Sequence, residues 1–131
     1  MADFPGIGHV ALTVTNLQTS AEWYRRLFEL EPVLDEDTGV FHHIIFILPG
    51  GGAVSLHGHA TTDTSNRFSE FRAGLDHLAF HVANRTELEA WTARLDKLGI
   101  EHGEIVDAHY GSGLSFRDPD NIALEFFALP S

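Results

Sequence analysis

The clearest structural pattern in the sequence is Gly74-Leu75-Asp76-His77-Leu78-Ala79-Phe80-His81-Val82. Its strict alternation of apolar and polar positions predicts a β-strand. The apolar face, which can cover a helix, consists of Leu78, Phe80 and Val82. The opposite face carries the imidazoles of His77 and His81, which are unusual side chains for a plain hydrophobic core.

The same pattern occurs earlier in the chain, in residues 6–14. His77 follows His9 by 68 positions (77 − 9). This spacing also relates Ala11 to Ala79, Trp23 to Trp91, Leu27 to Leu95, and Leu56-His57 to Leu124-Glu125. The sequence therefore predicts two copies of one unit, each with a possible metal ligand on its first strand and another on its last.

Each predicted unit is a strand, a helix, and then two or three further strands. In the first unit we expect strands over 7–15, 41–48 and 53–57, a helix ending near residue 29 before Pro32, and a polar turn over 35–39. In the second we expect strands over 75–83, 105–106, 114–117 and 122–127, a helix ending at Gly99, and turns over 109–113 and 118–121. Asn16 can cap the first helix, and capping-box spacing occurs at Thr19/Glu22 and, after Asn84, at Thr86/Glu89. We therefore expect one domain over 1–131, with modules at about 6–59 and 74–128 joined by a connection over 60–73.

Composition excludes several classes of protein. The net charge of −11 argues against nucleic acid or an anionic membrane as the main partner, because both need a basic footprint. No apolar run approaches the length of a membrane span, and no signal peptide is apparent, so we expect a cytoplasmic protein. The absence of cysteine excludes disulfides, zinc–thiolate sites and cysteine nucleophiles.

Two units of this kind can close into one curved sheet with the helices outside. Four side chains would then point into the concavity, from His9, His57, His77 and Glu125. Imidazole and carboxylate together suit divalent Zn, Ni, Fe, Mn or Co. Without His57, the other three would form a facial triad with open positions. The competing interpretation is that each histidine is structural, but the shared spacing of all four favours a metal site.

Several motifs resemble the vicinal oxygen chelate superfamily, which includes glyoxalase I, methylmalonyl-CoA epimerase, extradiol dioxygenases, fosfomycin-resistance transferases and bleomycin-binding proteins. They are Gly6-x-x-His9, Trp23-Tyr24, Gly74-x-x-His77, and Phe116-x-Asp118-Pro119-Asp120 leading to Leu124-Glu125. The resemblance implies an α+β fold, in which two βαβββ modules form a cup-like curved mixed sheet around a divalent metal. By position it implies His9, His77 and Glu125 as ligands, whereas His57 stands where glyoxalase I has a glutamate.

We therefore expect a metal-dependent lyase, isomerase or dioxygenase that acts on a small oxygen-rich substrate and assembles as a homodimer. The candidate bases are Glu125, His57 and His81, and the candidate substrate contacts are Tyr110, His43 and Phe116. The alternative is a metal-free binding protein that sequesters an antibiotic or another aromatic compound, as bleomycin-resistance proteins do. Metal content separates the two hypotheses.

Overall fold

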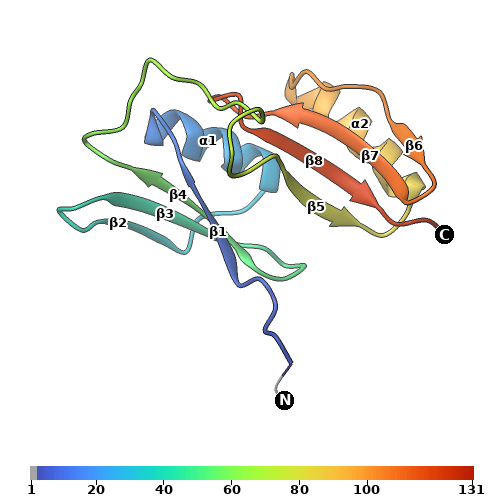
Figure 1. Ribbon diagram of the computed structural model, residues 1–131, viewed down its shortest axis with the longest axis horizontal. Helices are drawn as coiled ribbons and strands as arrows, with labels where there is room; N and C mark the ends of the chain where they lie inside the picture. The colour runs from blue at the N-terminus through green and yellow to red at the C-terminus, as the bar shows by residue number, and fades with distance from the viewer. Residues whose placement is uncertain (1–2) are drawn as a thin grey trace. The chain divides into compact units, whose positions relative to one another are not determined.

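The computed structural model describes residues 3–131 and contains two compact units (Figure 1). The first ends at Ser65 and the second spans Asn66–Ser131. Each unit has one strand, one helix and three further strands, in that order. This arrangement confirms the α+β class and the two predicted βαβββ modules.

The first unit forms a four-stranded mixed sheet with one helix. Its elements are β1 (His9–Thr13), α1 (Leu17–Phe28), β2 (Leu34–Asp37), β3 (His42–Ile47) and β4 (Ala53–Gly58). The strand order is β1-β4-β3-β2. The β1–β4 pair is parallel and the other pairs are antiparallel. Helix α1 connects β1 to β2, and the antiparallel β2–β3–β4 strands then bring β4 back beside β1.

The second unit repeats this topology. Its elements are β5 (Leu78–Val82), α2 (Arg85–Leu98), β6 (Val106–Ala108), β7 (Gly111–Arg117) and β8 (Ala123–Ala128). The strand order is β5-β8-β7-β6, again with a parallel first pair. In both units the strand that follows the last hairpin turn lies second in the sheet, beside the first strand.

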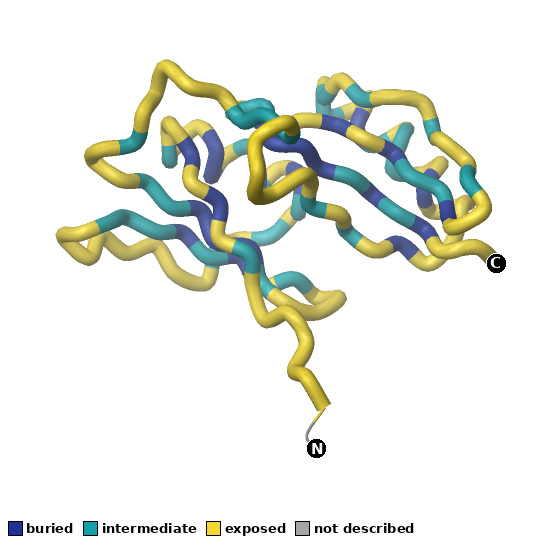
Figure 2. Tube along the Cα trace, in the orientation of Figure 1, coloured by how far each residue is buried: buried dark blue, intermediate teal, exposed yellow. Residues whose placement is uncertain are grey.

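One face of each sheet packs against the helix of its own unit. The buried sheet residues are Leu12, Ile44, Phe46, Val54 and Leu56 in the first unit, and Leu114, Phe116, Leu124 and Phe126 in the second. Their alternation with more exposed neighbours is visible along β3, β7 and β8 (Figure 2), whereas β4 has three consecutive buried residues, Val54, Ser55 and Leu56. The helices contribute the buried Leu27 and Leu95, and the Trp91 ring stacks on Phe126 at a centroid distance of 4.1 Å.

Asparagine caps both helices. Asn16 Oδ1 accepts a hydrogen bond from the Thr19 amide (3.0 Å), and Asn84 Oδ1 accepts one from the Glu87 amide (2.9 Å). Glu87 in turn accepts from the Ala83 amide. The predicted capping boxes at Thr19/Glu22 and Thr86/Glu89 are therefore wrong, because these residues lie inside the helices.

Two segments predicted as turns are partly strand. Leu34–Asp37 forms β2, although its sequence is mostly acidic, because Asp35 and Glu36 pair with Ile44 and His43 of β3. Gly111–Gly113 belongs to β7. The prediction that the second helix ends at Gly99 is confirmed, because Gly99 is the C-cap of α2, with a φ of 74°.

The turn before β8 is the one predicted over 118–121. Asp118 is buried, and its Oδ1 accepts hydrogen bonds from the amides of Asp120 and Ile122 at 2.8 Å. Asn121 has a φ of 68°, which asparagine tolerates better than most residues. This turn fixes the start of β8. Among residues 3–131, no helix is both long and apolar enough to span a bilayer.

Candidate functional site

The sheet face opposite the helix, called here the open face, carries candidate residues in each unit. In the second unit it holds a histidine–carboxylate pair. His77 precedes β5, and its Nε2 lies 3.6 Å from Glu125 Oε1 on β8. The other ring nitrogen, Nδ1, lies 2.7 Å from Asp76 Oδ1. An Nδ1–H that donates to Asp76 leaves the lone pair of Nε2 free for a ligand.

Two glycines of β7 make room for the side chains of β8. A Cβ on Gly113 would lie 2.8 Å from Glu125 Oε2, so the carboxylate extends across the backbone at this position. A Cβ on Gly111 would lie 2.3 Å from Phe127 Cζ. Both side chains of β8 therefore lie against strand β7 because β7 carries no side chain beneath them.

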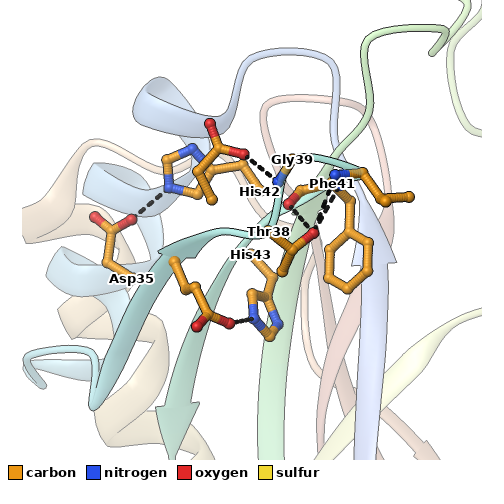
Figure 3. A network of polar contacts seen from close by, with 9 residues as sticks. Asp35, Thr38, Gly39, Phe41, His42 and His43 are labelled. Atoms are coloured by element: carbon orange, nitrogen blue, oxygen red, sulfur yellow. Dashed lines mark hydrogen bonds and ion pairs between the residues drawn. The ribbon is translucent and has the colours of Figure 1, made fainter.

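The open face of the first unit ends in a cluster of rings, which we call the His-Phe cluster: Phe41, His43, His57 and His59. Phe41 and His57 stack at 4.9 Å with an interplanar angle of 24°. His43 Nε2 lies 3.1 Å from Glu36 Oε1, and the neighbouring His42 bonds Asp35 from the opposite side of β3 (Figure 3). Two carboxylates of β2 thus hold the histidine pair of β3.

The cluster lowers the pKa of His57. Burial is the main cause, because it disfavours the charged imidazolium, and the imidazoles of His43, His59 and His9 add to the effect. His57 is therefore a neutral imidazole near pH 7. A neutral imidazole can accept a proton or donate a lone pair.

The strand register changes the equivalence that the 68-residue spacing predicts. The β1–β4 ladder pairs Ala11 with Ser55, whereas the β5–β8 ladder pairs Ala79 with Glu125. Since Ala11 and Ala79 are equivalent, the counterpart of Glu125 is Ser55, 70 positions earlier (125 − 55). The predicted equivalence of Leu56-His57 with Leu124-Glu125 is therefore wrong.

By the same ladders, His57 is the counterpart of Phe127. His57 pairs with Thr13, and Phe127 with His81. Both counterparts take part in ring stacks, because Phe127 lies nearly parallel to Tyr110 at 6.3 Å (15°). His57 shares the open face with Ser55 but lies two residues further along β4.

Ser55, the register counterpart of Glu125, is a residue that the sequence analysis did not single out. Its side chain is 3% exposed, and Oγ has no hydrogen-bond partner among the described residues. It lies on the central strand β4, between Ala11 of β1 and Ile45 of β3. The only sequence signal was that a small polar residue interrupts the apolar run of β4 (AVSL).

The structure places the remaining candidates differently. His9 is exposed at the start of β1, His81 is exposed on β5, and Tyr110 is 64% exposed before β7. Phe116 is 3% exposed and stacks on Phe126 at 5.1 Å, on the side of the sheet that faces α2. This burial contradicts the prediction that Phe116 contacts a substrate, because its face of β7 is filled by the core.

Neither unit by itself gathers a complete metal site. Over residues 3–131, the structure contains no group of three or more His, Asp or Glu side chains arranged to hold a metal ion. The two candidate ligands that it does bring together are His77 and Glu125.

Solved structures with the same fold support this architecture. A glyoxylase/bleomycin resistance protein/dioxygenase domain from Frankia sp. EAN1pec is 34% identical, with a TM-score of 0.88, and the match covers 98% of this chain and 95% of that one. A variant of the fosfomycin resistance protein FosX from Listeria monocytogenes, complexed with Mn(II) and dihydroxypropylphosphonic acid, shares the fold at 20% identity. Its TM-score is 0.69, and the match covers 95% and 93% of the two chains.

Two curated proteins are similar in sequence. A protein described as the ring-cleaving dioxygenase MhqA of Bacillus subtilis (strain 168) is 28% identical over 127 residues, which are 93% of this chain but 39% of MhqA. The metallothiol transferase FosB of Shouchella clausii (strain KSM-K16) is 29% identical over 92% of this chain and 77% of its own length. The family model for the Glyoxalase/Bleomycin resistance protein/Dioxygenase superfamily matches residues 6–126. The chain therefore belongs to this superfamily.

Proposed function

We propose that the protein is a metal-dependent enzyme that acts on a small substrate through two neighbouring substrate oxygens. The observation that carries the proposal is the pair formed by His77 and Glu125, whose Nε2 and Oε1 atoms lie 3.6 Å apart on the open face of the second unit. An imidazole and a carboxylate at this separation can supply two ligands to one divalent cation.

The proposed ligand set is His9, His77 and Glu125. His9 stands in the first unit where His77 stands in the second, at the equivalent position before Ala11 and Ala79. The donor types fit Mn, Fe, Co, Ni or Zn, and the Asp76 carboxylate fixes the His77 tautomer that leaves Nε2 unprotonated. A bound divalent metal would act as a Lewis acid and stabilise negative charge on the substrate oxygens.

Three side chains are proposed to move or hold a proton: Glu125, His57 and His81. His57 is suited to act as a base because its pKa is lowered by burial and by the neighbouring imidazoles. In our proposal His57 does not belong to the ligand set, because the register makes Ser55, and not His57, the counterpart of Glu125. His43 and Tyr110 remain proposed substrate contacts.

The relatives differ in their reactions, so several classes of reaction have to be tested. MhqA is named as a ring-cleaving dioxygenase, FosB as a metallothiol transferase, and FosX was solved with Mn(II) and a phosphonic acid. Because the chain spans 39% of MhqA, similarity to MhqA alone does not carry the activity of the whole protein. We propose dioxygenase, lyase and isomerase chemistry as the classes to test.

The test is metal identification on protein purified without a histidine tag, followed by assays with catechols, fosfomycin plus thiols, hemithioacetals and acyl-CoA epimers. We expect uptake of one divalent metal per proposed site, lost in His77→Ala and kept in a His102→Ala control, since His102 bonds Asp96 and Gly103 of its own unit. No uptake of Mn(II), Fe(II), Ni(II) or Zn(II) on titration would contradict the enzyme proposal and favour the metal-free binding protein.

We also propose that the protein is a homodimer. The proposed ligands come from both units, and a dimer can supply them either within each chain or by exchange of units between chains. Sedimentation tests the dimer. Co-expression of His9→Ala with Glu125→Ala tests exchange, because restored metal binding in the mixed dimer requires ligands from two chains. A monomer by sedimentation would contradict the proposal.

A further inference from the structure

We infer that the parallel rings of Tyr110 and Phe127 form a binding surface for an aromatic ring of the ligand, and that Phe127 is thereby a specificity-determining residue. The inference rests on the proposed function only in that the same molecule would bind the metal through two oxygens. All residues that carry the inference belong to the second unit. Phe127 was not among the candidates from the sequence, because phenylalanine is an ordinary strand residue.

The first argument is the position of Phe127 on β8. Glu125 and Phe127 are two residues apart, so both side chains lie on the open face, opposite the buried Phe126 between them. The Glu125 carboxylate extends across Gly113, and Gly113 is the partner of Phe127 in the β7–β8 pairing. The carboxylate and the base of the Phe127 side chain are therefore neighbours on the open face.

The second argument is the geometry of the two rings. Tyr110 and Phe127 are nearly parallel, at an interplanar angle of 15° and a centroid distance of 6.3 Å. The rings are too far apart for direct face-to-face contact, so part of each flat face is left uncovered by the other ring. A flat ligand can stack on faces that are held in this way.

The third argument is that the fold orders both rings before a ligand binds. A Cβ on Gly111 would lie 2.3 Å from Phe127 Cζ, so the Phe127 ring lies directly against the backbone of Gly111. His109 and Tyr110 form the two-residue turn that joins β6 to β7. The His109 ring contacts the Tyr110 ring edge to face, at 5.3 Å. A surface that is already ordered loses less side-chain entropy when a ligand binds.

The fourth argument is exposure. Tyr110 is 64% exposed, and Phe127 is half-buried. In the first unit the counterpart of Phe127 is His57, which instead stacks on Phe41 at 4.9 Å within the His-Phe cluster. A ligand ring that stacks on Tyr110 and Phe127 removes apolar surface from water, which favours binding. We therefore expect the ligand of this surface to carry a flat aromatic ring.

The first experiment compares two chelators that differ in one group. Benzohydroxamate and acetohydroxamate bind a metal through the same two oxygens, but the first carries a phenyl ring where the second carries a methyl group. Calorimetry measures the affinity of each for Mn(II)-loaded protein. We expect a preference of about tenfold or more for benzohydroxamate in the unmodified protein, and about threefold or less in Phe127→Leu and in Tyr110→Leu. Acetohydroxamate affinity is expected to stay within about twofold, because its methyl group cannot stack.

Matched variants separate ring stacking from damage to the fold. Phe127→Tyr and Tyr110→Phe keep a flat ring at each position, so we expect both to keep the preference for benzohydroxamate. Phe71→Leu is the control for the loss of an exposed aromatic side chain, because Phe71 is 93% exposed in the segment before β5. It is expected to keep the preference as well. Circular dichroism checks the fold of each variant.

The second experiment distinguishes failure of the inference from failure of the proposed function. Saturation-transfer NMR on metal-free protein is expected to detect the phenyl protons of benzohydroxamate, with the signal lost in Phe127→Leu. Unmodified protein that does not prefer benzohydroxamate, or a preference that stays unchanged in both leucine variants, would overturn the inference. If the unmodified protein binds no metal, the proposed function is contradicted. The NMR comparison then decides the inference alone, because loss of the signal in Phe127→Leu supports it and an unchanged or absent signal overturns it.

Discussion

The two units have buried residues at equivalent positions of their cores, but they differ on their open faces. By register, Val54 and Leu56 correspond to Leu124 and Phe126, and all four are buried. On the open faces the counterparts are unlike in size and charge. They are His43 and Gly113, Ser55 and Glu125, and His57 and Phe127.

The same topology therefore carries a carboxylate, Glu125, in one unit and a hydroxyl, Ser55, at the equivalent position in the other. In the second unit β7 has glycine at positions 111 and 113. The side chain of Glu125 can therefore lie across the backbone of Gly113. In the first unit β3 carries His43 instead, and the adjacent face is filled with rings. The helix-facing side stays constant because its residues must fill a core, whereas the open side is free to change.

The difference between the two open faces is tested most directly by removing the counterpart side chains of Glu125 and Ser55 in separate variants. Glu125→Ala is expected to lower Mn(II) affinity by more than about 100-fold, because loss of a charged ligand exceeds the 10- to 100-fold typical of outer-shell partners. Ser55→Ala, at the equivalent place, is expected to change Mn(II) affinity by about twofold or less. Calorimetry measures both, and equal losses in the two variants would contradict the proposal that Glu125 is a metal ligand and its counterpart Ser55 is not.

The need for glycine on β7 can be tested by stability. Gly111→Ala would place a Cβ 2.6 Å from the Ala128 carbonyl oxygen, at a φ of 146° that L-residues rarely adopt. We expect a loss of about 2 kcal/mol in the free energy of unfolding, measured with urea. Gly50→Ala is the control, because a Cβ there meets nothing within 4 Å and is expected to cost about 0.5 kcal/mol or less. A Gly111 variant as stable as the control would show that the strand adapts.

A smaller effect is expected where the obstacle is a flexible side chain. Gly113→Ala would place a Cβ 2.8 Å from Glu125 Oε2, and the carboxylate would have to move aside. We expect Mn(II) affinity to fall about tenfold with little change in stability, because a ligand displaced by about an ångström still reaches the metal imperfectly. Gly103→Ala serves as the control, since the nearest atom to its Cβ would lie at 3.9 Å. Unchanged affinity in the Gly113 variant would mean that Glu125 reaches the metal from another rotamer.

The smallest expected effects are in the pH dependence of stability of metal-free protein, and they have opposite signs in the two units. The pKa of His57 is lowered by burial and by neighbouring imidazoles, so its contribution to stability is lost as pH falls below about 6.5 and through the folded-state pKa. The pKa of His102 is raised by the Gly103 carbonyl and by Asp96, so its contribution is present below about 6.5 and is lost as pH rises through the folded-state pKa.

Variants separate the two contributions. His57→Gln is expected to reduce the loss of stability on acidification, and His102→Gln is expected to increase it. Urea unfolding midpoints between about pH 5 and pH 8 measure both slopes. Slopes that change in the same direction in the two variants would contradict the opposite signs of the two pKa shifts.

Much of the fold followed from periodicity. The alternation in 75–83 and the helical spacing of Trp91 and Leu95 predicted β5 and α2, because burying one apolar face requires these periods. β2 was missed because an edge strand of four exposed residues, three of them acidic, carries no apolar alternation. The predicted capping box of the second helix was wrong because Asn84, immediately before α2, is the N-cap, and Thr86 lies inside the first turn.

The site was harder to predict than the fold. His77 and Glu125 were identified from residue type and spacing, and the structure brings them together. The predicted equivalence of His57 with Glu125 was wrong for a physical reason. A shift of two residues keeps every side chain on the same face of a strand, so the hydrophobic pattern of β4 is identical in either register. Only the hydrogen-bonded pairing of β4 with β1 distinguishes the two registers.

Strand β2 also affects how the protein behaves in concentrated solution. It is the last strand of its sheet, and its consecutive side chains Asp35, Glu36 and Asp37 are exposed. An exposed strand edge is a template on which a second chain can add a strand and begin to aggregate, and like charges on both approaching edges oppose that step. Salt screens this repulsion, with a Debye length of about 10 Å at 0.1 M. The acidic edge therefore protects against aggregation best at low ionic strength.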